Sequence, residues 1–417
     1  MTAIDGGRLA IWAICAAATA GVILRPFRWP EAIWAVAGAA VLLAAGLLPV
    51  EAAWRAVGKG TDVYLFLAGM MLLSEIARRE GLFERVAAMA VNQARGSPRR
   101  LFLLVYLVGT AITTFLSNDA TAVVLTPAVY AAARKAELEP LPYLFICAFV
   151  ANAASFVLPI SNPANIVLYG DHTPPLGTWL LAFALPSVAA IGMTYLALRL
   201  TEGRRLAARC AEAVELPRMS RGAWAALWGI GLTGGVLLTA SALGRPLGAP
   251  TCAMGLLTAA VVWLREKSSP WDTLKGVSWS VLVLVAGLFV LVQALDQTGL
   301  IVSLAQALRH AAGGVAWAAG AATALASNLM NNLPVGLIAS SAVAQAHPPQ
   351  KLVDALLIGV DLGPNLSVTG SLATILWLTA IRREGEHVGF WRFLKAGAVV
   401  APPALILALA IRLWSPV

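Results

Sequence analysis

Twelve apolar segments, separated by short polar stretches, make up most of this 417-residue chain. They lie at residues 9–24, 31–50, 62–79, 101–133, 141–169, 178–199, 222–243, 249–264, 277–296, 312–346, 352–381 and 394–414. Most of them approach or exceed the roughly 20 residues that a helix needs to cross a bilayer. Only 12% of the residues are charged, about half the usual share in a soluble domain. We therefore predict an all-α polytopic membrane protein in a lipid bilayer, because helices satisfy their own backbone groups there.

A polar cluster interrupts the fourth apolar segment, residues 101–133. The cluster consists of Ser117, Asn118 and Asp119. A single helix over this segment would be about 50 Å long, against the roughly 30 Å that a bilayer core requires. Arg100 precedes the segment and Arg134 follows it, so both ends face the same side of the membrane. The pattern predicts a re-entrant helical hairpin with its polar tip at membrane depth.

The tenth segment, residues 312–346, has the same form, with Asn331 and Asn332 near its middle. It predicts a second hairpin. If the other ten segments are full spans and the N-terminus lies outside, the inside loops hold 23 of the 30 Lys and Arg residues. The positive-inside rule favours this orientation. We therefore expect a multi-pass protein of the inner (cytoplasmic) membrane with both termini periplasmic.

Residues recur in the same order in the two halves of the chain. Matched pairs are Gly69 with Gly287, Asp119 with Asn332, and Asn152 with Asp361. Each half holds five spans and one hairpin, and an odd number of crossings gives the halves opposite orientations. The pattern predicts two inverted repeats, residues 1–210 and 211–417, as in many secondary transporters.

Each hairpin is followed by an apolar segment that contains helix-breaking residues. The first, residues 141–169, contains Pro159 and Pro163, and the second, residues 352–381, contains Pro364. Proline removes an amide donor and clashes with the preceding turn, so we predict that both helices break within the membrane. Unwound backbone at that depth must face protein or a water-filled cavity. Two hairpin tips and two broken helices therefore predict one central chamber.

Hydroxyl, carboxamide and carboxylate groups in this chamber are suited to binding a hydroxylated solute. The candidate substrate-binding residues are Ser117, Asn118, Asp119, Asn152, Ser161, Asn162, Asn165, Asn331, Asn332, Asn365, Thr369 and Ser371. Asp119 and Asp361 are intramembrane carboxyl groups, one from each half, and we expect them to couple protons or coordinate a cation. The alternative is that each merely caps a half-helix. Glu75 and Asp296 lie nearer the ends of their spans, where we expect solvated or interfacial positions.

Other residue patterns favour transport over other functions. The four cysteines are scattered without a CxxC pair, so we expect no disulfide, metal site or cofactor. The basic residues lie in short loops, which indicates membrane orientation and argues against a nucleic-acid partner. An intramembrane enzyme is the alternative from another class. The four histidines lie in loops, and neither an HExxH nor a nucleophile-elbow motif occurs, so we expect a transporter and not an enzyme.

Several of these motifs together resemble those of the arsenite efflux pump family, within the wider ion transporter superfamily. Residues 115–127, FLSNDATAVVLTP, resemble the first hairpin of that family. Residues 151–155, ANAAS, and 161–166, SNPANI, are similar to its next broken helix. Residues 330–334, MNNLP, resemble its second hairpin. The resemblance covers essentially the whole chain.

This resemblance implies export of arsenite and antimonite from the cytoplasm by proton antiport, with or without a cytoplasmic arsenite-stimulated ATPase. Sodium- or proton-coupled carriers of dicarboxylate, citrate or sulfate-type anions, and silicic acid carriers of the same superfamily, are the alternatives. Dicarboxylate carriers have Ser-Asn-Thr at both hairpin tips, whereas this chain has Asp119 at one tip and Asn332 at the other. A carboxylate at the tip would repel a dianion. It favours a neutral trihydroxide such as arsenous acid, or a cation.

Overall fold

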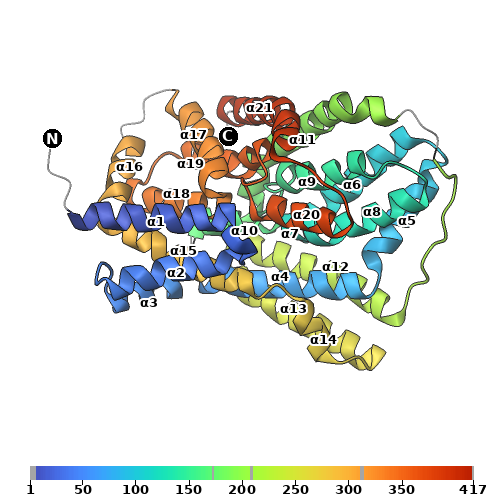
Figure 1. The fold of residues 1–417 in the computed structure, drawn as a ribbon, viewed down its shortest axis with the longest axis horizontal. Helices are drawn as coiled ribbons and strands as arrows, with labels where there is room; N and C mark the ends of the chain where they lie inside the picture. The colour runs from blue at the N-terminus through green and yellow to red at the C-terminus, as the bar shows by residue number, and fades with distance from the viewer. Residues whose placement is uncertain (1–5, 171–172, 207–209, 310–313, 416–417) are drawn as a thin grey trace.

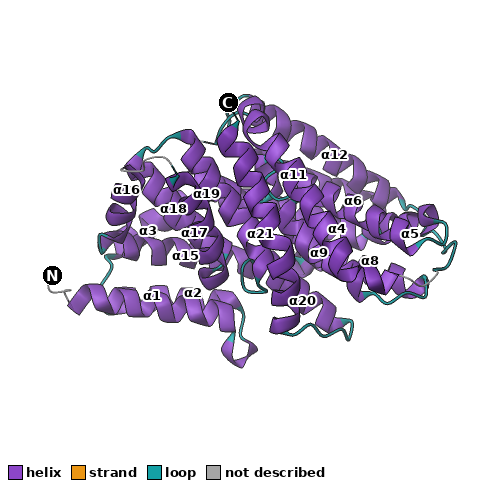
Figure 2. Ribbon diagram, turned by 90° about the horizontal axis from the view of Figure 1, so that it is seen from above, coloured by secondary structure: helices purple, strands orange, loops and turns teal. Residues whose placement is uncertain are grey.

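The computed structural model describes residues 6–170, 173–206, 210–309 and 314–415, which form helices and loops without a strand among them (Figure 2). Residues 312–313, at the start of the predicted second hairpin, lie outside these ranges, as do His172 and His310. The prediction of an all-helical polytopic protein is confirmed.

The described residues form α-helices along both halves of the chain. Those of the first half are α1 (Gly6–Leu24), α2 (Glu31–Ala44), α3 (Val50–Lys59), α4 (Thr61–Arg79), α5 (Leu82–Ala94), α6 (Pro98–Phe115), α7 (Asn118–Ala120), α8 (Thr126–Lys135), α9 (Leu141–Ala153), α10 (Pro163–Tyr169) and α11 (Leu176–Glu202). Those of the second half are α12 (Arg221–Ala242), α13 (Gly248–Glu266), α14 (Pro270–Gly276), α15 (Ser280–Gln297), α16 (Leu300–Arg309), α17 (Val315–Met330), α18 (Asn332–Ala346), α19 (Gln350–Leu362), α20 (Leu372–Arg383) and α21 (Phe390–Trp414). In Figure 1, α16 lies towards the left end of the molecule and α5 towards the right end.

Fewer single helices could cross a membrane than the ten spans predicted. Among the described residues, six helices are long and apolar enough, and the pair α3 and α4, bent by 50°, brings the number to seven. Segment 31–50 gives only the 14-residue α2, which ends just before Gly46 adopts a positive φ of 66°. Segments 141–169 and 352–381 each divide into two helices, as their prolines predicted.

Four helices fall in stretches that hydropathy left outside the apolar segments: α3, α5, α14 and α16. In α5, for example, Ala87, Val91 and Ala94 form a buried face, while the polar residues lie on other sides of the helix. Such helices are short or amphipathic and so do not register as long apolar segments, and packing against the rest of the protein stabilises them.

Several extensive helix contacts join the two halves. Helix α4 packs along α13, and in the matching contact α15 packs along α2. A Cβ atom on Gly69 would overlap the backbone of Thr251 in α13, and one on Gly287 would lie 2.9 Å from the Cβ of Ala35 in α2. Small residues let membrane helices approach closely, so these glycines set both contacts. Each half therefore packs against its counterpart.

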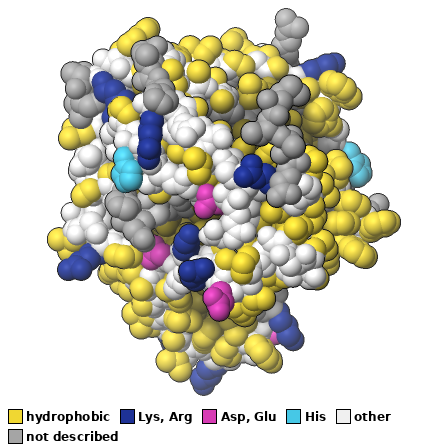
Figure 3. Space-filling view, turned by 90° about the vertical axis from the view of Figure 1, so that its left-hand side faces the viewer, with side chains coloured by type: hydrophobic (Ala, Val, Ile, Leu, Met, Phe, Trp, Pro, Cys, Tyr) yellow, Lys and Arg dark blue, Asp and Glu magenta, His cyan; other side chains and the backbone are white. Residues whose placement is uncertain are grey.

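Large hydrophobic side chains are exposed along the outer helices. On α11, Leu185 and Val188 are 69% and 68% exposed, and Trp228 on α12 is 67% exposed. Figure 3 shows hydrophobic side chains over the lower and right flanks of one end of the molecule, with charged side chains scattered over its middle. Such flanks suit contact with lipid chains.

Candidate functional site

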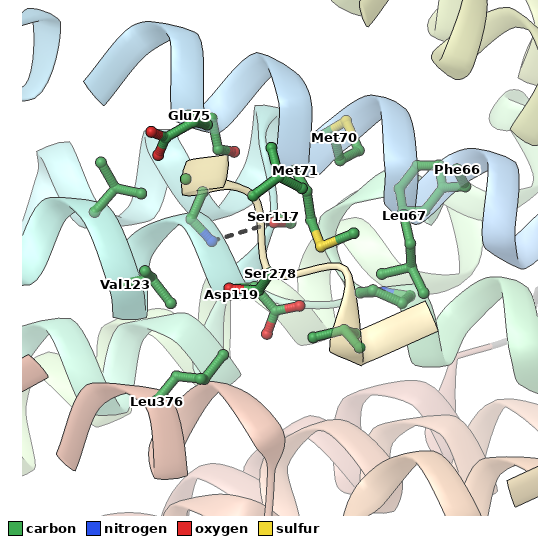
Figure 4. A pocket seen from close by; sticks show the side chains of 17 residues that line it. Phe66, Leu67, Met70, Met71, Glu75, Ser117, Asp119, Val123, Ser278 and Leu376 are labelled. Atoms are coloured by element: carbon green, nitrogen blue, oxygen red, sulfur yellow. Dashed lines mark hydrogen bonds between the residues drawn. The ribbon is translucent and has the colours of Figure 1, made fainter. Parts of the chain in front are cut away.

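The first predicted hairpin is two helical arms joined at the polar cluster. Helix α6 ends at Phe115, and a second arm runs from α7 through the π-helical turn η2 (Thr121–Leu125) into α8. The Ser117 hydroxyl caps this arm by accepting a hydrogen bond from the amide of Ala120, at 3.3 Å. Asp119 is therefore not the capping residue, and its half-buried carboxyl group faces a cavity (Figure 4).

The second tip has the same kind of cap but different surroundings. Asn331 adopts a φ of 76° and a ψ of 151°, and its Oδ1 accepts a hydrogen bond from the amide of Leu333 at 3.3 Å. The amide of Asn332 donates to the carbonyl oxygen of Gly370 at 2.9 Å. The second tip is thus fastened to the segment between the two parts of the second broken helix.

The two broken helices are joined by reciprocal side-chain contacts. Asn152, near the end of α9, donates from Nδ2 to Oδ1 of Asn365 at 3.0 Å and to the Thr374 hydroxyl at 3.3 Å. In the matching contact, Nδ2 of Asn162 donates to Oδ1 of Asp361, near the end of α19, at 2.7 Å. All five side chains are buried. The chain thus brings together residues that the sequence placed in one chamber.

Three buried oxygen atoms in this region accept no hydrogen bond from the described residues. They are Oδ1 of Asn152, Oδ1 of Asn165 and Oδ2 of Asp361. A buried acceptor without a partner costs about 1–3 kcal/mol, and more for a charged group. Asp361 lies within α19 rather than at its start, so it does not cap that helix. Its free oxygen can instead hold a proton or face a cation.

A small, partly open cavity lies beside the first tip (Figure 4). It offers about 60 Å³ to water-sized solutes, several times the roughly 10–15 Å³ that one water requires. Its polar lining consists of Ser74, Glu75, Ser117, Asp119 and Ser278. Among its apolar lining are Met70 and Met71 of α4, Pro163 and Leu376. Of the predicted binding residues, only Ser117 and Asp119 line this cavity.

The expectation of a solvated position for Glu75 is wrong. Its side chain is buried, and the Arg78 guanidinium donates to it from Nε at 2.7 Å and from Nη2 at 2.6 Å. The segment 276–278, which begins at the last residue of α14, borders the same cavity. A Cβ atom on Gly276 would overlap the Glu75 carboxylate. The second half of the chain thus covers Glu75, which position along one helix could not reveal.

Several other predicted binding residues hold the loops around the breaks. Ser161 donates from its hydroxyl to the carbonyl oxygen of Thr114 at 3.0 Å. Thr369 donates to the carbonyl oxygen of Asn328 at 3.0 Å, and Ser371 caps α20. Asn118 accepts a hydrogen bond from the amide of Asp119 at 2.9 Å. Substrate contact by these residues stays a prediction.

A buried ion pair that the sequence analysis missed lies at the other end of the second broken helix. Nη2 of Arg412 lies 2.6 Å from Oδ2 of Asp354, and both side chains are buried. The Tyr169 hydroxyl donates to Oδ1 of Asp354 at 2.5 Å, and Nε2 of Gln350 donates to the same oxygen at 2.8 Å. A buried ion pair persists only with such additional hydrogen bonds. The cluster joins α10, α19 and α21.

Comparison with known proteins finds transporters. A family model described as "Citrate transporter" matches residues 14–360. An arsenical pump membrane protein of Escherichia coli is 28% identical over 402 residues, which cover 90% of this chain and 91% of that protein. A protein of the same name from Yersinia enterocolitica is 27% identical over 398 residues, covering 89% and 90%. These similarities confirm the resemblance drawn from the hairpin motifs.

Two solved structures share the fold. The YdaH transporter of Alcanivorax borkumensis superposes with a TM-score of 0.55 at 16% identity, covering 86% of each chain. MtrF of Neisseria gonorrhoeae, described as one of a class of antimetabolite efflux pumps, gives a TM-score of 0.50 at 12% identity, covering 86% of this chain and 82% of that one. At such identities the likeness concerns the fold alone.

Proposed function

The chain belongs to the citrate transporter (CitMHS) family. We propose that it is a secondary active transporter and that it exports arsenite and antimonite from the cytoplasm. Its family and its relatives are membrane transporters and not enzymes. One observation carries the choice of substrate: the cavity at the first tip holds Asp119, Glu75 and three serine hydroxyls, and none of its described lining residues is Lys, Arg or His.

Arsenous acid is neutral near pH 7 and carries three hydroxyl groups. Carboxylate and serine oxygens accept hydrogen bonds from such groups, and serine hydroxyls also donate. The names of the relatives, arsenical pump membrane proteins, point to the same substrate class. We therefore assign the first substrate contacts to Asp119 and Ser117.

Citrate or another organic anion is the second candidate, because the description of the family names citrate. An anion with several carboxylates would meet the Asp119 carboxylate in this cavity, whose described lining includes no Lys, Arg or His. Two like charges about 4 Å apart repel by about 4 kcal/mol at an effective dielectric constant of 20. The lining of the cavity thus favours the neutral metalloid hydroxide.

Proton antiport is the proposed coupling mechanism, with Asp119 and Asp361 as the coupling groups. The Asp361 carboxyl group is bound through Oδ1 to Asn162, while Oδ2 has no partner among the described residues and can take up a proton. Asp119 can exchange a hydrogen bond to substrate for a proton, because its carboxyl group borders the cavity. One carboxyl group from each half would then carry the cycle.

We further propose that the chain consists of two inverted repeats, residues 1–210 and 211–417, each with five spans and a re-entrant hairpin. The repeated helix order, the exchanged contacts α4–α13 and α2–α15, and the reciprocal contacts between the broken helices support this proposal. The distribution of basic residues favours the inner membrane with both termini periplasmic. A cytoplasmic arsenite-stimulated ATPase, implied by the resemblance, is proposed as an accessory partner.

Everted membrane vesicles with an imposed pH gradient test this proposal. An acidic lumen should drive arsenite into the vesicles without ATP, in exchange for protons that leave. Added ATP and the cytoplasmic ATPase should raise the rate if that partner acts. Arsenite uptake at a rate independent of the pH gradient, or uptake of citrate in place of arsenite, would refute the proposed function.

A further inference from the structure

We propose that the cavity at the first tip is a two-sided subsite for a pyramidal trivalent metalloid hydroxide. The thioethers of Met70 and Met71 form the side that faces the arsenic or antimony atom. The serine and carboxylate oxygens form the side that binds the hydroxyl groups. This inference rests on the proposed function and deepens it, because it assigns metalloid specificity to two residues outside the hairpin tips and broken helices.

Both methionines come from α4 and line the cavity together with Asp119. Met70 is buried and Met71 is half-buried. In Figure 4 the sulfur of Met71 points towards the space beside Asp119 and Ser278. None of the four cysteines lines this cavity, so these thioethers are the sulfur atoms among its described lining residues.

The oxygen atoms border the same space on α4 and on the hairpin tip. Ser74 and Glu75 come one helical turn after the methionines on α4, while Ser117 and Asp119 come from the hairpin tip. The Arg78 guanidinium fixes Glu75 through two hydrogen bonds. Hydroxyl groups of a bound solute therefore meet acceptors held by two separate elements.

A trivalent metalloid hydroxide has the matching shape. Its three hydroxyl groups lie on one side of a pyramid, and the soft central atom with its lone pair lies on the other. Soft sulfur ligands favour soft central atoms, whereas oxygen ligands favour hard ones. A thioether is a neutral and weak donor, so binding stays reversible, as a carrier requires. A tetrahedral hydroxide such as silicic or germanic acid has no soft side to present.

The matching positions of the second half lack this arrangement. At the spacing that relates Gly69 to Gly287, Met70 and Met71 correspond to Leu288 and Phe289. Ser74 and Glu75 correspond in the same way to Val292 and Gln293. The fold therefore accepts aliphatic and aromatic side chains at the methionine positions, which separates the need for sulfur from the need for packing.

Competition experiments with the full-length chain in proteoliposomes test this subsite. In the Met70→Leu/Met71→Leu double variant, arsenite and antimonite should bind roughly tenfold more weakly, as expected when a pocket loses a specific contact. Weak competition by germanic acid should stay unchanged. Methionine-to-leucine changes conserve volume, so the variant should fold. Met89→Leu, at a methionine on α5 that is exposed and outside the cavity, is the matched control and should behave as wild type.

The outcomes separate the subsite from the proposed function. Wild-type arsenite transport with unchanged arsenite affinity in the double variant overturns the subsite alone. Failure of the wild type to transport either metalloid overturns both. X-ray absorption of the arsenite-loaded protein gives a second readout that does not depend on transport. It should detect sulfur next to arsenic in the wild type and in Met89→Leu but not in the double variant, and an all-oxygen environment in the wild type would also overturn the subsite.

Discussion

The two hairpin tips use the same backbone device in different chemical surroundings. A capping side chain begins the second helical arm at both, Ser117 at the first and Asn331 at the second. The first tip places a half-buried carboxyl group, Asp119, beside a cavity. The second places the buried Asn332 against the backbone of Gly370. The caps are thus common to both tips, whereas the carboxyl group occurs only at the first tip, where we propose that the substrate binds.

The first turns of the two broken helices differ in a comparable way. Phe145 of α9 packs against Trp377 and Phe393, with ring centroids 5.7 and 6.1 Å away. At the spacing that relates Asn152 to Asp361, Phe145 corresponds to Asp354, which pairs with Arg412. One end is closed by aromatic packing and the other by an ion pair.

Neutralising the first tip should have the largest effect. Asp119→Asn conserves shape but removes the group that exchanges a proton, so arsenite transport should fall by about 100-fold or more. Uptake into everted vesicles measures this effect, with protein abundance checked by immunoblot. Near-wild-type transport by this variant would remove Asp119 from the coupling mechanism.

Charging the second tip should affect folding instead. Asn332→Asp places a carboxyl group at a buried position, in a residue whose backbone amide donates to the Gly370 carbonyl oxygen. An uncompensated buried charge costs about 3 kcal/mol, so detergent-solubilised protein should unfold at lower denaturant concentration. If this variant is as stable as wild type, the two tips are chemically more alike than their surroundings suggest.

Narrowing the cavity should have an intermediate effect. Gly276→Ala displaces the Glu75 carboxylate, and we expect about tenfold slower arsenite transport from such a misplacement. Gly192→Ala is a matched control, since a Cβ atom there has nothing within 4 Å. Equal rates for the two variants would show that Glu75 tolerates movement.

Relieving backbone strain at the second tip should have the smallest effect. Asn331 adopts a φ of 76° and a ψ of 151°, a conformation that costs a non-glycine residue about 1–3 kcal/mol. Asn331→Gly removes this strain and loses only a few tenths of a kcal/mol in capping. Denaturation should show that the free energy of unfolding rises by about 1 kcal/mol. Ser117→Gly should show no such rise, because the φ of 159° at Ser117 is close to extended backbone and carries no comparable strain.

The sequence predicted the breaks at the two tips and within the two broken helices because their signals are local. Polar clusters and prolines within an apolar segment mark a break wherever the rest of the chain lies. It did not predict the burial of Glu75 or the cavity beside Asp119. Both depend on segment 276–278, which lies some two hundred residues from Glu75 and carries no motif. Such features depend on which remote segments lie next to each other in the fold, and a hydropathy pattern carries no information on that.

The contacts of α4 with α13 and of α2 with α15, which join the two halves, also have a consequence for biogenesis. The glycine face of α4 finds its partner, α13, only after nearly two hundred further residues have been synthesised. At about 5–20 residues per second, a nascent chain waits about ten seconds or more with this face uncovered in the bilayer. We therefore expect an insertase or chaperone to shield the glycine face of α4 during that interval. Slowing translation between α4 and α13 should increase degradation of the unfinished protein.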